Sequence, residues 1–163
     1  FKQGLAFLLT TRGIPQMYYG TEIMMGVEEG DFLRADFPGG WAEDEKTAFT
    51  AEGRTPEQNE SWNFASTLLN WRRTSKAVGE GRLVHYTPDN RTKCYVYARV
   101  AGDETVLVIL NGSDTMRLVD MHRFSEVMKD NTKGKDVVTG EVVDLTSLVK
   151  IEPRGVYVLE LSK

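Results

Sequence analysis

From Gly81 to the C-terminus the sequence consists of short apolar runs, many with every second residue apolar, divided by turn residues. This period, with turns such as Asn111-Gly112 and Thr139-Gly140 between the runs, is typical of β-strands. The candidate strands are Arg82–Tyr86, Lys93–Val100, Thr105–Asn111, Thr115–Val119, Lys135–Val138, Glu141–Asp144, Leu148–Ile151 and Val156–Leu161. Only one helical turn, Phe124–Lys129, is expected among them. The region therefore predicts an antiparallel β-sandwich.

The residues before Gly81 follow a helical period instead. Apolar residues of Phe1–Arg12 fall on one helical face, and Gly13 and Pro15 end that predicted helix. A second helix is predicted over Glu57–Ala77. It is preceded by the sequence Thr55-Pro56-Glu57-Gln58, which fits a capping box. The shift of pattern near Gly79 predicts two domains, residues 1–79 and 80–163.

A strand and a long loop are expected between the two helices. Gln16–Tyr19 has extended-type residues, and a helix followed by such a strand is the building block of a parallel sheet. The loop runs from Gly20 to about Pro56, and structureless segments longer than about 12–15 residues are usually functional or disordered. The loop offers Asp31, Arg34 and Trp41 as candidate binding residues, and its acidic part, residues 42–55, is expected to be mobile.

Charge and composition exclude several classes of function. The net charge is −4 without a block of basic residues, which argues against nucleic acid or an anionic membrane as a partner. No apolar run reaches the roughly 20 residues of a spanning helix. With Cys94 as the single cysteine and only His85 and His122 as histidines, we predict no internal disulfide, no metal site and no cofactor in this chain.

Four segments resemble the α-amylase superfamily, glycoside hydrolase family 13. They are GIPQMYYGTE (13–22), DFLRADFPGGW (31–41), NWRRTSKAV (70–78) and CYVYARVAGDETVLVILNGS (94–113). The loop segment is most similar to the neopullulanase and cyclomaltodextrinase group. The resemblance implies a mixed fold. Residues 1–79 would be helix 7, strand 8, a long loop and helix 8 of a (β/α)8 barrel, and residues 80–163 the β-sandwich called domain C.

The same resemblance implies the C-terminal part of an enzyme that hydrolyses α-1,4-glucosidic bonds with retention. Its partner would be an α-glucan: a maltooligosaccharide, starch or pullulan. Family members use three catalytic carboxylates that precede the region resembled here, so no catalytic residue is assigned and this chain alone is expected to be inactive. The bacterial parent would be periplasmic or cytoplasmic, and calcium is compatible with the full-length parent without being predicted here. Apolar barrel faces would favour self-association.

Each candidate binding residue also has a structural interpretation. Asp31 and Arg34 are expected to bind sugar hydroxyls in a donor-side subsite, as the resemblance implies, or to form a local salt bridge that pins the loop. Trp41 is expected to stack on a sugar face or to pack the loop down. For the whole chain, the alternative function is a free-standing, non-catalytic β-sandwich module that binds carbohydrate or has a structural role.

Overall fold

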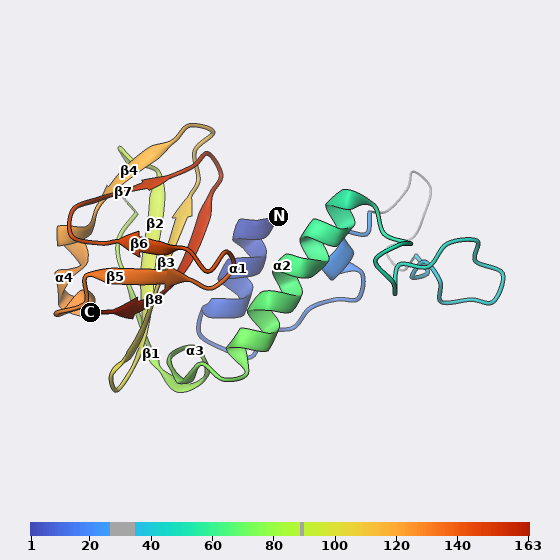
Figure 1. The fold of residues 1–163 in the computed structure, drawn as a ribbon, viewed down its shortest axis with the longest axis horizontal. Coiled ribbons are helices and arrows are strands. Elements are labelled where there is room, and N and C mark those ends of the chain that lie inside the picture. The colour runs from blue at the N-terminus through green and yellow to red at the C-terminus, as the bar shows by residue number, and fades with distance from the viewer. Residues whose placement is uncertain (27–34, 89) are drawn as a thin grey trace. The chain divides into compact units, whose positions relative to one another are not determined.

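The computed structural model describes residues 1–26, 35–88 and 90–163 (Figure 1). The chain divides into two compact units: one contains Phe1 and Pro15–Ser66, and the other contains Lys2–Ile14 and Thr67–Lys163. Helix α1, Lys2–Thr10, therefore belongs to the same unit as the strands. The domain boundary near Gly79 stays a prediction about the parent protein.

In the part of the larger unit that the structure describes, eight antiparallel strands make up most of the fold, and they confirm all eight predicted strands to within a few residues. Six form one sheet in the order β1-β2-β3-β8-β5-β6, and β4 pairs with β7 in a second sheet. Their bounds are β1 Arg82–His85, β2 Cys94–Ala101, β3 Glu104–Asn111, β4 Arg117–Asp120, β5 Lys133–Asp136, β6 Val142–Asp144, β7 Leu148–Ile151 and β8 Val156–Ser162.

The alternation of the strand residues explains the core between these two sheets. In β7, Val149 and Ile151 are buried whereas Leu148 and Lys150 are exposed, so one face of the strand points into the protein. The core also holds Val96, Ala98, Leu107, Ile109, Val119 and Leu159. A short turn of helix, η2 (Met121–Phe124) followed by α4 (Ser125–Met128), closes one end and confirms the helical turn predicted in this region.

Helix α1 covers the opposite face of the six-stranded sheet. Tyr97 alternates with the core residues of β2, and its ring lies edge-on to that of Phe7, with centroids 5.8 Å apart. The Tyr97 hydroxyl also lies 2.6 Å from the Thr10 hydroxyl. At the other end of α1, the Gln3 amide donates to the carbonyls of Asn111 and Gly155. The helix is thus fixed to the sheet at both ends.

Two arginines complete the C-terminus of α1. The guanidinium of Arg99, from the same face of β2 as Tyr97, donates to the carbonyls of Thr10 and Thr11 at 2.9 and 2.7 Å, and to that of Gly81 at 2.8 Å. Arg72 donates to the carbonyls of Leu9 and Gly13. A helix leaves its last carbonyls without internal donors, and cations are favourable at this end.

The second long helix is shorter than predicted. α2 runs over Pro56–Arg72, and its capping box is confirmed. The backbone amide of Thr55 donates to the side-chain oxygen of Gln58 at 2.9 Å, and the backbone amide of Gln58 donates to the Thr55 hydroxyl at 3.2 Å. The predicted continuation to Ala77 is wrong because Ser75 takes extended backbone and caps a separate helix, α3 (Lys76–Glu80).

In the smaller unit, the predicted strand Gln16–Tyr19 is also wrong. These residues pair with none of the described strands, and the next regular element is the short 3-10 helix η1, Thr21–Ile23. An extended segment becomes a strand only through hydrogen bonds to neighbours. The apolar and aromatic composition of the segment carried no information on such partners, and Tyr19 lies in a turn. Among the described residues, the helices are too short and polar to cross a bilayer.

Candidate functional site

Trp41 lies on an exposed turn of the smaller unit, with 62% of its surface accessible. The Asp44 carboxylate holds this turn, because its Oδ2 atom accepts from the amides of Gly39 at 2.7 Å and Trp41 at 3.2 Å. The Gly40 amide donates to the carbonyl of Phe37 at 2.9 Å. The backbone of the turn is therefore fixed while the indole stays accessible, which an aromatic platform for a flat ligand requires.

Further contacts tie the rest of this loop to the start of α2. Arg54 donates to the Ala48 carbonyl at 3.0 Å and to the Asn59 side chain at 2.9 Å, and its guanidinium lies 4.5 Å from the centre of the Trp62 ring. The Asn59 amide donates to the Ala51 carbonyl at 2.8 Å. Residues 42–55, expected to be mobile, are therefore held by contacts that no local sequence pattern indicates.

The other two candidate binding residues, Asp31 and Arg34, lie outside the described residues, so their roles stay predictions. Near them along the chain, Tyr18 and Tyr19 both remain substantially exposed, and their ring centroids lie 4.6 Å apart. The Tyr19 hydroxyl donates to the Ala35 carbonyl at 2.8 Å. Exposed aromatic rings thus occur both before Asp31, at Tyr18 and Tyr19, and after Arg34, at Trp41.

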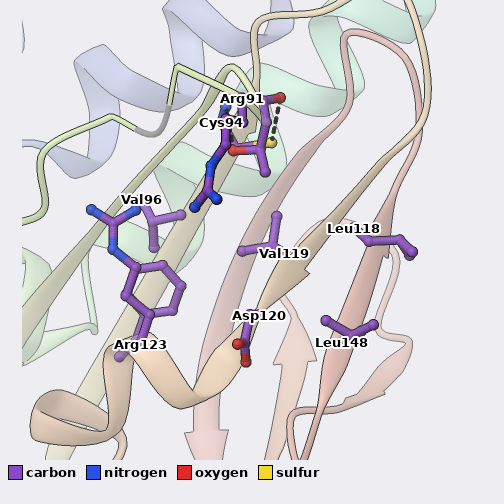
Figure 2. Close-up of a pocket in the computed structure, with 10 residues that line it drawn as sticks. Arg91, Cys94, Val96, Leu118, Val119, Asp120, Arg123 and Leu148 are labelled. Atoms are coloured by element: carbon purple, nitrogen blue, oxygen red, sulfur yellow. Dashed lines mark hydrogen bonds between the residues drawn. The ribbon is translucent and has the colours of Figure 1, made fainter.

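A separate pocket of about 430 Å³ lies in the sandwich unit, between β2, β4, β7 and η2 (Figure 2). Its apolar lining comes from Val96, Val119, Phe124, Leu118 and Leu148. Val96, Val119 and Phe124 are buried, whereas Leu118 is 48% and Leu148 56% exposed. The pocket therefore has a core floor and an accessible aliphatic wall.

Charged side chains from three segments line the same pocket. Arg91 precedes β2, Asp120 ends β4 and Arg123 belongs to η2. Arg123 donates to the carbonyl of Thr87 at 2.6 Å, which fixes its position. Oδ1 of Asp120 lies 3.0 Å from the amide nitrogen and 2.9 Å from the ring Nδ1 of His122, and these hydrogen bonds lower the pKa of the carboxyl. Asp120 is thus ionised at neutral pH, and the charged residues described in this lining are two cations and one anion.

Sequence reasoning missed this pocket. Its residues come from segments that are far apart along the chain, near positions 91, 120 and 148, and antiparallel pairing brings the last two together: Asp120 lies opposite Leu148. The one local signal is that Leu118 and Leu148 occupy strand positions where the alternation expects polar residues. No group of three or more potential metal ligands occurs in the part of the chain that the structure describes.

Residues 83–160 match the family model of the cyclo-malto-dextrinase C-terminal domain. The chain is also 30% identical over 115 residues to a cyclomaltodextrin glucanotransferase of Bacillus sp. (strain 1-1), an alignment that covers 71% of this chain and 14% of that protein. The sandwich unit is thus of the type found in C-terminal domains of amylase-like enzymes.

Solved structures show the same fold. The crystal structure of AmyP in complex with maltose matches with a TM-score of 0.73 and 19% identity, over 98% of this chain and 33% of that one. An α-amylase from Geobacillus thermoleovorans, complexed with acarbose, matches with a TM-score of 0.70 and 18% identity, over 99% and 33%. Together, these matches support a C-terminal fragment of an enzyme of the α-amylase superfamily, glycoside hydrolase family 13. The chain spans only about a third, or less, of the relatives it matches.

Proposed function

We propose that this chain is the C-terminal part of an α-glucan hydrolase of the neopullulanase and cyclomaltodextrinase type. The match of residues 83–160 to the cyclo-malto-dextrinase C-terminal domain carries the proposal. The parent would act on α-1,4-linked glucans with retention, a reaction that needs two carboxyl groups about 5–5.5 Å apart on either side of the glycosidic bond. We assign neither of them to this chain, and the chain alone is expected to be inactive.

In this proposal, residues 1–79 are the last helix–strand–loop–helix part of a (β/α)8 barrel. The order of α1 before the segment Gln16–Tyr19 supports this role, because a barrel would supply neighbouring strands with which that segment could pair. The exposed side chains of Phe1, Tyr18 and Phe49 also support it, since a barrel would offer them apolar partners. Without those partners, the same side chains would favour self-association.

The long loop would then form one wall of the glucan-binding cleft. The exposed indole of Trp41, held by the Asp44 turn, supports stacking on a glucose ring. Asp31 and Arg34 would bind sugar hydroxyls, because a carboxylate accepts and a guanidinium donates hydrogen bonds in fixed directions. Stacking of this kind is insensitive to the exact length of the glucan, which suits a substrate that is an oligosaccharide or a polymer.

Calorimetric titration of the chain with maltoheptaose tests the binding surface. We expect measurable binding that the Trp41→Ala variant loses and that a matched control, Met116→Ala at an exposed position in the sandwich unit, retains. Equal binding by both variants would contradict the role of Trp41. Light scattering on the same samples tests self-association, for which a monodisperse monomer is the contrary result.

The coding sequence upstream of Phe1 and an activity assay test the proposed parentage. We expect an open reading frame that continues upstream and carries the three carboxylate motifs of the family, and no release of reducing sugar from maltoheptaose or pullulan by the purified chain. A start codon immediately before Phe1 would instead favour the free-standing carbohydrate-binding module. Hydrolysis by the chain, lost when one of its own carboxylates is replaced, would contradict the proposed inactivity.

A further inference from the structure

The pocket between β2, β4, β7 and η2 has features that the proposed glucan cleft does not explain. It lies wholly in the sandwich unit, and its volume of about 430 Å³ falls within the range of roughly 300–1,000 Å³ that is usual for small-molecule sites. A binding site at this position would therefore depend on the sandwich alone. Whether it exists is independent of the function proposed above.

The charges of the pocket favour an anion. Arg91 and Arg123 contribute two guanidinium groups, which Figure 2 shows on the same side of the pocket, near Val96. Asp120 contributes one carboxylate, but its Oδ1 atom already accepts from the amide of His122 and contacts its ring. Among the lining residues that the structure describes, the formal charges therefore sum to +1, in a chain whose net charge is −4.

The geometry of Arg123 fits this role. Its hydrogen bond to the Thr87 carbonyl uses one of the five N–H donors of a guanidinium and fixes the plane of the group. The guanidinium also lies 5.8 Å from the centre of the Phe124 ring, which holds it over the apolar floor. A planar, oriented guanidinium binds a carboxylate or a phosphate through paired hydrogen bonds, at low cost in side-chain entropy.

The rest of the lining favours an aliphatic body over a sugar ring. Leu118 and Leu148 form the accessible wall, and Figure 2 shows them across the pocket from the two arginines. Phe124, the one aromatic among the described lining residues, is only 1% exposed, and its ring packs edge-on against Tyr86 with centroids 4.8 Å apart. It therefore offers no platform on which a glucose ring could stack.

We propose that this pocket binds a small organic anion, with the carboxylate or phosphate held by Arg91 and Arg123 and the aliphatic body lying on Leu118 and Leu148. The two guanidiniums would supply charge-assisted hydrogen bonds, and the leucines would lose exposed apolar surface when the ligand is bound. Asp120 would disfavour ligands with a second negative charge placed toward β4.

Titration of the full chain with four probes, followed by NMR chemical shifts and by calorimetry, tests the site. The probes are hexanoate, hexyl phosphate, hexanol and maltoheptaose. We expect hexanoate or hexyl phosphate to shift resonances of β4, β7 and η2, and the stronger of the two identifies the headgroup. Hexanol, which lacks the charge, should bind at least about tenfold more weakly, as expected for the loss of charge-assisted hydrogen bonds.

Variants with equal charge changes separate the pocket from general electrostatics. Arg91→Gln and Arg123→Gln should each weaken binding of the anion by about tenfold or more. Arg73→Gln, at an exposed position directly after α2, should change the affinity less than about twofold if long-range charge effects are screened. Thermal melts of the three variants establish that each is folded.

Three results would overturn the proposal: hexanol that binds as tightly as the anions, equal affinities in the pocket variants and Arg73→Gln, or maltoheptaose that shifts the same resonances in preference to the anions. These results leave the glucan-hydrolase proposal untouched, because that proposal is tested at Trp41 and by the upstream sequence.

Discussion

Nη1 of Arg99 lies 2.9 Å from the carbonyl oxygen of Thr10, so a guanidinium from the middle of β2 closes the C-terminus of α1. Arg99 is only 2% exposed, and burial lowers the pKa of its guanidinium. A buried cation is tolerated when it is hydrogen-bonded, and here the carbonyls of Thr10, Thr11 and Gly81 serve as acceptors.

Replacing Arg99 should weaken the attachment of α1 to the sheet. Arg99→Leu replaces the guanidinium with a shorter, apolar side chain and leaves three carbonyls without their donor, so we expect the free energy of unfolding to fall by about 2–4 kcal/mol. Urea denaturation followed by far-ultraviolet circular dichroism measures the change. Arg73→Leu, at an exposed position, should stay within about 0.5 kcal/mol of the parent chain. Equal stability of the two variants would mean that Arg99 does not hold α1.

Tyr97 should make the chain sensitive to alkaline pH. Burial raises the pKa of its phenol above the ordinary value, so above about pH 10 the unfolded tyrosine loses a proton that the folded one retains. The native state then binds more protons than the unfolded state, and the stability that is fully present below pH 10 falls as the pH rises.

The Tyr97→Phe variant measures this contribution. At pH 8 it should be less stable by about 1 kcal/mol, because the hydroxyl contact with Thr10 is lost. Above pH 10 its stability should fall less steeply than that of the parent chain, by up to about 1.4 kcal/mol per pH unit. Urea titrations at several pH values, with Tyr18→Phe at an exposed tyrosine as the control, give both slopes. Parallel slopes for all three proteins would refute the prediction.

Gly53 should be intolerant of any side chain. A Cβ atom at this position would lie 1.7 Å from the carbonyl oxygen of Thr47, so the backbone of the loop must move. We expect Gly53→Ala to destabilise the loop by about 1–3 kcal/mol and to speed tryptic cleavage after Lys46 and Arg54. Gly79→Ala is the control: its Cβ would meet nothing within 4 Å, and alanine is the better helix former in α3.

Asp44 should matter for binding only through Trp41. In Asp44→Ala the amides of Gly39 and Trp41 lose their shared acceptor, so we expect a weaker affinity for maltoheptaose but not the loss expected for Trp41→Ala. Calorimetry on the two variants gives the comparison, with Glu45→Ala as the neighbouring control. An effect of Asp44→Ala larger than that of Trp41→Ala would point to direct contact between the carboxylate and the sugar.

The features that could be predicted from the sequence are those with local causes. The strands follow from alternation and turn residues, and the Thr55–Gln58 capping box follows from four consecutive residues. The contact of Gln3 with Asn111 and Gly155 is a long-range pairing that no periodicity encodes. The same holds for the pocket of Arg91, Arg123 and Leu148, which exists only once β4 and β7 have paired.

The attachment of α1 to the sheet also determines which residues must be included when the sandwich is transplanted into another enzyme. A graft that begins at the shift of pattern near Gly79 would lack α1, which covers Tyr97 and Arg99. Both side chains would then be exposed to solvent without their partners in α1. The transferable unit is discontinuous: it must carry Lys2–Ile14 along with Thr67–Lys163, joined by a linker of the designer's choice.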